Sequence, residues 1–85
     1  MKKFKTDIGY VVYRITKPEL KSVNCGNICD FCNTAVNDGY LIPVLNQFVC
    51  EGCFDDWKDR GKYYKEDIGH ETKISQYYES LINVE

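Results

Sequence analysis

The chain lacks any run of about 20 apolar residues, the length that an α-helix needs to cross a bilayer, so we expect no membrane span. Lys2, Lys3 and Lys5 stand near its start, but no continuous apolar segment follows them, so no signal peptide is indicated. We therefore expect a cytoplasmic protein. In that reducing compartment, paired cysteines bind metal more often than they form disulfides.

Residue patterns for catalysis are also scarce. His70 is the only histidine, which argues against a Ser–His–Asp arrangement, and no glycine-rich phosphate loop occurs. The carboxylates Asp55, Asp56 and Asp59 are spaced as a solvated helix face rather than as an acid–base pair. We therefore expect that the protein is not an enzyme. A redox or metal-donor role, with Cys25 as an exchanging thiol, is the enzymatic alternative.

Positive charge is limited to one part of the chain. The formal net charge is −2, with a balance of +4 in residues 1–24 and −6 in residues 25–85. Four thiolates and one Zn²⁺ would bring the net charge to about −4. A free-standing nucleic-acid binder usually carries an excess of positive charge. The balance therefore disfavours nucleic-acid binding, although residues 1–24 keep that alternative open.

The chain does contain two Cys-x-x-Cys pairs. Cys29 and Cys32 form the first, Cys50 and Cys53 form the second, and seventeen residues separate them. A two-residue spacer lets both sulfurs of a pair approach one ion at about 2.3 Å, and two such pairs complete a tetrahedron. The spacing predicts a closed structural Zn²⁺ site, although iron also occupies four-thiolate sites. Four free or disulfide-bonded cysteines are the alternative.

Cys25 is left over and precedes the first pair by four positions. We interpret it as a free thiol near the site, with an exchangeable ligand as the alternative. A domain of 85 residues buries a modest part of its surface. Structural zinc contributes on the order of 10–16 kcal/mol of apparent binding energy that is coupled to folding. We therefore expect the middle of the chain to need metal for its structure.

The residue types predict a small α+β fold made as one domain over residues 1–85. Residues 8–15 are rich in β-branched and aromatic types and predict a strand, with imperfect alternation that indicates partial cover on both faces. A loop is expected over residues 16–28, because Pro18 disfavours helix at Lys17. A β-hairpin follows, with strands near 40–43 and 47–50, and it returns Cys50 to Cys32.

Two helices complete the prediction. The first has Cys53 in its first turn and ends at Gly61, which we expect to be a left-handed cap. The second covers residues 71–82, after a linker that starts at residue 63. Its apolar residues recur at offsets of 0, 3, 4, 7 and 8, as on one face of a helix. They are Ile74, Tyr77, Tyr78, Leu81 and Ile82.

A zinc knuckle, a hairpin and a Cys-x-x-Cys pair that enters a helix together describe a treble clef. Residues 29–64 resemble GATA-type zinc fingers, whose four ligands match Cys29, Cys32, Cys50 and Cys53. The resemblance implies a treble clef over residues 29–62, between an N-terminal strand and loop (1–28) and the linker and helix of 63–85. Residues 33–49 contain no Lys or Arg, so the DNA binding of that family does not follow.

A second resemblance rests on the run Ile-Pro-Val-Leu-Asn at 42–46, on Trp57, and on residues 63–68. These features look like those of small bacterial zinc-finger proteins of phages and other mobile elements. The resemblance implies an accessory protein without a known activity.

The function that the sequence favours is a structural zinc module that mediates protein–protein interaction. A catalytic zinc keeps a position open for water, and four thiolates would close it. Trp57, Tyr77 and Tyr78 are the partner-binding candidates, although core packing over the zinc and the hairpin is the interpretation that we favour for Trp57. The terminal helix packs on the same chain or pairs with a second copy, which leaves monomer and homodimer open. A nucleic-acid-binding zinc finger is the alternative function.

Overall fold

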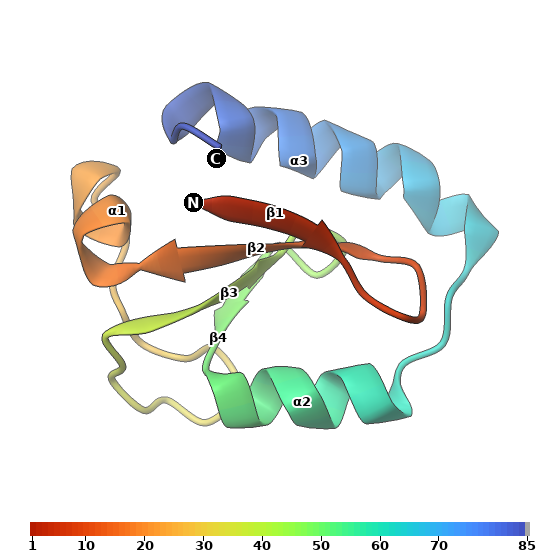
Figure 1. Ribbon diagram of the computed structural model, residues 1–85, viewed down its shortest axis with the longest axis horizontal. Helices are drawn as coiled ribbons and strands as arrows, with labels where there is room; N and C mark the ends of the chain where they lie inside the picture. The colour runs from red at the N-terminus through yellow and green to blue at the C-terminus, as the bar shows by residue number, and fades with distance from the viewer. Residues whose placement is uncertain (85) are drawn as a thin grey trace.

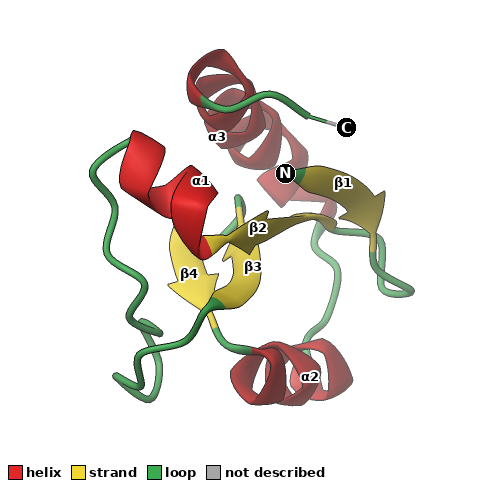
Figure 2. Ribbon diagram, turned by 60° about the vertical axis from the view of Figure 1, so that its left-hand side comes forward, coloured by secondary structure: helices red, strands yellow, loops and turns green. Residues whose placement is uncertain are grey.

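A four-stranded antiparallel sheet lies between helices in the computed structural model, which describes residues 1–84 (Figure 1). The sheet has the order β1-β2-β3-β4. Figures 1 and 2 show α2 on one face and α1 and α3 on the other. The elements are β1 (Lys2–Lys5), β2 (Val11–Thr16), α1 (Lys17–Ser22), β3 (Asp38–Ile42), β4 (Gln47–Val49), α2 (Glu51–Arg60), the 3₁₀ turn η1 (Lys65–Asp67) and α3 (Ile68–Leu81).

The helices on both faces explain why apolar residues run continuously through the strands. Successive side chains of a strand point to opposite faces. In β2, Tyr13 and Ile15 join the core under α3, whereas Val12 joins the core over α2. The two cores are completed mainly by Leu20, Leu41, Phe48 and Tyr78 on the α3 side, and by Cys29, Tyr40, Ile42, Val49 and Phe54 on the α2 side.

The hairpin is confirmed within one or two residues of its predicted strands. β3 and β4 pair antiparallel, with Leu41 opposite Phe48. The tight turn at residues 43–46 is closed by Asn46, which has a φ of 53° and donates its N–H to the Pro43 carbonyl at 3.0 Å. Pro43 therefore follows the last residue of β3, where no ladder donor is required.

The N-terminal third differs from the prediction. The expected strand over residues 8–15 begins only at Val11, because residues 6–10 form a turn that lets β1 pair with β2. Residues 16–28 are not a continuous loop, because Thr16 ends β2 and α1 covers Lys17–Ser22. Glu19 accepts hydrogen bonds from the backbone N–H and hydroxyl of Thr16, each at 3.1 Å. Pro18 is tolerated because it occupies the first turn of the helix.

The two later helices are present, with different ends. α2 begins at Glu51, which puts Cys53 in its first turn as predicted. Gly61 is not a left-handed cap, because its φ and ψ are −70° and 148°. It is closely packed instead, since an added Cβ would lie 2.9 Å from the Trp57 carbonyl oxygen. α3 begins three residues before the predicted start, directly after η1.

The predicted apolar stripe of α3 is only partly buried. Tyr78 lies in the core, and Ile74 and Ile82 pack against it, whereas Tyr77 and Leu81 are exposed. Among residues 1–84, no helix combines the length and apolar character that a membrane crossing requires.

Candidate metal centre

The first cysteine pair lies on a tight turn that is fixed to the sheet. Residues 28 and 35 form a β-bridge at its base, and the Cys29 N–H donates to the Thr34 carbonyl at 3.0 Å. Asp30 anchors the turn to β4 in two ways. Its N–H donates to the Phe48 carbonyl at 2.8 Å, and its carboxylate accepts from the Phe48 N–H at 2.9 Å. The turn thus has a defined position beside the end of β4.

The second pair lies at the junction of β4 and α2. Cys50 follows the last residue of β4 and is the N-cap residue of α2, with an extended backbone. Cys53 lies three residues later in the first helical turn. Phe54 holds this end of the helix on the sheet, because its ring stacks on Tyr40 with centroids 4.1 Å apart. The helix start therefore faces the Cys29–Cys32 turn.

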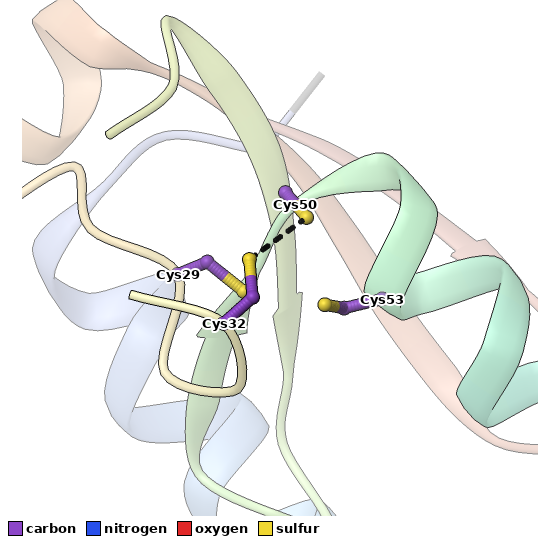
Figure 3. A group of neighbouring side chains, drawn as sticks. All are labelled: Cys29, Cys32, Cys50 and Cys53. Atoms are coloured by element: carbon purple, nitrogen blue, oxygen red, sulfur yellow. Dashed lines mark hydrogen bonds between the residues drawn. The ribbon is translucent and has the colours of Figure 1, made fainter. Parts of the chain in front are cut away.

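The four cysteine sulfurs converge, as Figure 3 shows. One ligand atom from each of Cys29, Cys32, Cys50 and Cys53 lies within 4.8 Å of the others. A tetrahedron with Zn–S bonds of about 2.3 Å has sulfur–sulfur edges of about 3.8 Å. The Cys32 and Cys50 sulfurs are 3.8 Å apart. The donor set and its spacing fit Zn²⁺, and the four cysteines are positioned to bind a metal ion.

Hydrogen bonds favour the thiolate form at two of these cysteines. The Thr34 hydroxyl and backbone N–H lower the pKa of Cys32 to about 6. Burial opposes the ionisation of Cys29, yet backbone N–H donors, including that of Phe31, outweigh it and lower the pKa of Cys29 below its ordinary value. Such donors also orient and stabilise sulfur that binds a metal.

Cys53 has the opposite tendency. Its hydrogen bond with Cys50, followed by burial and the nearby sulfurs, raises its pKa to about 12. Ionised sulfurs this close repel one another, so thiolates at Cys29 and Cys32 disfavour loss of the proton from Cys53. A divalent cation at the centre of the group would remove that repulsion, because thiolate is the form that ligates metal.

The remaining candidates lie apart from the four sulfurs. Cys25 is exposed and is not a member of the group. Trp57 is half-buried and packs on the α2-side core, in agreement with the core packing that the sequence favours for it. Tyr78 is buried on the α3 side, whereas the neighbouring Tyr77 is 60 % exposed. Because the sheet separates α2 from α3, the three partner-binding candidates do not form one surface.

Sequence reasoning missed the residues that support the ligands. Asp30 lies in the spacer of the first pair, and it fixes the turn to β4. Thr34, which bonds the Cys32 sulfur at 3.3 Å, was not singled out. Their positions within two residues of a ligand are the only signal in the sequence that could have indicated them.

Comparison of the chain with protein-family models, curated proteins and solved structures yields no match.

Proposed function

We propose that the protein is a structural zinc module in which Cys29, Cys32, Cys50 and Cys53 hold one Zn²⁺. The observation that carries this proposal is the convergence of four sulfurs, within 4.8 Å of one another, from two separate segments. Four thiolates fill a tetrahedral zinc and leave no position for water or substrate. The ion would therefore join the turn, β4 and α2, and its binding energy would stabilise the fold.

We further propose that the segment over residues 29–62 is a treble clef. Three features support this arrangement: a tight turn that carries the first pair, a hairpin, and a helix that carries Cys53 in its first turn. These are the parts that the resemblance to GATA-type fingers implied, in the same order along the chain.

The module acts, in this proposal, by binding another protein. Large apolar side chains remain exposed on several parts of the chain, among them Phe31, Tyr64 and Tyr77. Exposed aromatic side chains are common anchors at protein interfaces. The resemblance to small proteins of phages and other mobile elements supports an accessory role of this kind.

The basic residues give less support to nucleic-acid binding. Lys3 pairs with Glu79 and Arg14 pairs with Asp38, each at 2.9 Å. These contacts partly neutralise two of the cations that make residues 1–24 positive. A phosphate binder presents unpaired cations along one face.

Elemental analysis of the purified protein tests the zinc proposal. We expect about one zinc per chain, and circular dichroism should show loss of structure when a strong chelator removes it. A chain that contains no metal and is nonetheless folded would contradict the proposal. For the partner, the zinc-loaded protein is used as bait in its native host, beside a low-salt shift assay with DNA and RNA. A shift that weakens steeply as salt rises would favour nucleic acid instead.

A further inference from the structure

A cavity of about 220 Å³ lies away from the four cysteines, on the face of the sheet that α2 covers. Its walls come from the hairpin turn, the end of α2, and the chain between α2 and α3. Its lining includes Tyr10, Trp57, Lys62, Tyr64 and Asp67.

Three of the lining residues are aromatic: Tyr10, Trp57 and Tyr64. Tyr10 is held in place by its contacts. The rings of Tyr10 and Trp57 have centroids 5.9 Å apart. The Tyr10 hydroxyl accepts the Tyr64 N–H at 3.0 Å and lies 3.2 Å from the Lys62 carbonyl. These bonds fix the linker against the turn that precedes β2. The walls made by Tyr10 and Trp57 are therefore formed before any ligand arrives, which reduces the cost of binding.

A carboxylate stands among these aromatic residues. Asp67 is half-buried, and its Oδ2 accepts a hydrogen bond from the Tyr10 hydroxyl at 2.7 Å. Asp67 has no ion pair with any residue that the structure describes. Aromatic faces attract cations, and a partly desolvated carboxylate forms strong hydrogen bonds with them. The cavity thus combines two independent features that select positive charge.

We propose that this cavity binds an arginine side chain of the protein partner. The inference rests on the proposed protein-binding function and names the chemistry of the contact. A guanidinium is planar, stacks on aromatic rings and offers a fork of donors to a carboxylate, which an ammonium does not. The Asp67 carboxylate in the cavity complements a basic partner side chain, and the formal net charge of the chain, −2, does not oppose its approach.

Lys62 is the competing occupant from the chain itself. It lines the cavity, is exposed, and forms no ion pair within residues 1–84. Its ammonium could be attracted by the same carboxylate. The experiment must therefore separate an arginine ligand from this lysine.

The single tryptophan provides the readout, because Trp57 lines the cavity. The zinc-loaded protein is titrated with N-acetyl-arginine amide, and Trp57 fluorescence is recorded. N-acetyl-citrulline amide, a neutral molecule of nearly the same shape, is the control ligand. We expect a saturable change with the arginine probe and at least about fivefold weaker binding of the citrulline probe, since a hydrogen bond to a charged group contributes more than a neutral one. Equal responses to the two probes would overturn the proposal.

Matched variants locate the effect. Asp67→Asn keeps an acceptor for Tyr10 and should weaken the arginine probe at least about fivefold. Glu66→Gln removes the same charge one position away and should change binding less than about twofold. Lys62→Gln should bind the probe at least as well as the natural chain. Equal losses in Asp67→Asn and Glu66→Gln, or binding seen only in Lys62→Gln, would contradict an arginine site. Zinc content is measured in every sample, so failure of the metal proposal is seen separately.

Discussion

The sulfur atoms of Cys32 and Cys50 lie 3.8 Å apart although 18 positions separate the two residues in the chain. The hairpin accounts for most of this separation, because it carries the chain out along β3 and back along β4. The hydrogen bonds between Asp30 and Phe48 then set the Cys29–Cys32 turn beside the end of β4. The candidate metal centre therefore depends on the hairpin as much as on the ligands.

Replacement of single cysteines should separate the four proposed ligands from the fifth cysteine. We expect Cys29→Ser and Cys53→Ser to lose bound zinc and the structure of residues 29–60, because a serine hydroxyl does not replace a thiolate ligand. The loss should reach several kcal/mol, given apparent zinc binding of about 10–16 kcal/mol. Zinc content and circular dichroism are the measurements.

Cys25→Ser is the matched control for these variants. Cys25 is exposed and lies outside the sulfur group, so the control should keep one zinc per chain and its stability. Zinc loss in Cys25→Ser equal to that in Cys29→Ser would mean that the proposed ligand set is wrong.

Acid should weaken the contact between Glu79 and β1–β2. Hydrogen bonds from Tyr13, and then from Lys3, hold the pKa of Glu79 below its ordinary value of 4.5. Because the pKa is depressed, the contact stabilises the fold above about pH 4.5. This contribution is lost as the pH falls through the pKa that Glu79 has in the folded protein. Because Glu79 is partly exposed, we expect less than about 1 kcal/mol.

Urea unfolding of the natural chain and of Glu79→Gln, at neutral pH and near pH 4, measures this effect. Protons also displace zinc from thiolates in both proteins, so the difference between the two is the informative quantity. That difference should shrink in acid. A difference that stays constant or grows would refute the role given to Glu79.

Gly39 should tolerate no side chain. An added Cβ would lie 2.5 Å from the Val49 carbonyl oxygen and 2.8 Å from the Phe48 ring, so the hairpin would have to move. We expect Gly39→Ala to lower the free energy of unfolding by about 1–3 kcal/mol, as overpacking does.

Gly69→Ala provides the opposite case, because Gly69 lies in α3 and its Cβ would meet nothing within 4 Å. That variant should gain about 0.5–1 kcal/mol, since alanine loses less backbone freedom in a helix. Thermal or chemical unfolding of both variants is the test. If the two substitutions changed the free energy of unfolding equally, the close approach of Val49 and Phe48 would not be the reason that position 39 excludes a side chain.

Tyr77 and Tyr78 should behave differently although they are adjacent. Tyr78 is 8 % exposed, packs edge-on against Tyr13, and donates its hydroxyl to Asn46 at 2.6 Å. We expect Tyr78→Ala to cost about 3–5 kcal/mol of stability. Tyr77→Ala should change stability by less than about 0.5 kcal/mol, as at an exposed site, and should reduce partner capture by the zinc-loaded protein. Unchanged capture by Tyr77→Ala would remove Tyr77 from the interface.

The sequence alone determined the local features of this protein. The two Cys-x-x-Cys pairs identified the four side chains that come together. A two-residue spacer lets both sulfurs of a pair approach the same ion, whatever the rest of the chain does. The hairpin followed from apolar runs on either side of a turn. The helix α2 followed from the charge order after Cys53, with acidic residues in an early turn and basic residues near the end, as the helix dipole favours. Each of these signals lies within a few neighbouring residues, where local geometry decides the structure.

Only the tertiary structure decided which faces are covered and which segments meet. β1 carries three lysines and has a weak strand signal, and it is a strand because β2 offers it a free edge. Equally, periodicity put Tyr77 and Tyr78 on one apolar stripe of α3, yet only Tyr78 points into the core. The cavity at Asp67 is lined by residues that lie far apart in the sequence, from Tyr10 to Asp67. Contacts of this range depend on how whole layers pack, and that packing is a property of the assembled sheet and helices rather than of any local pattern.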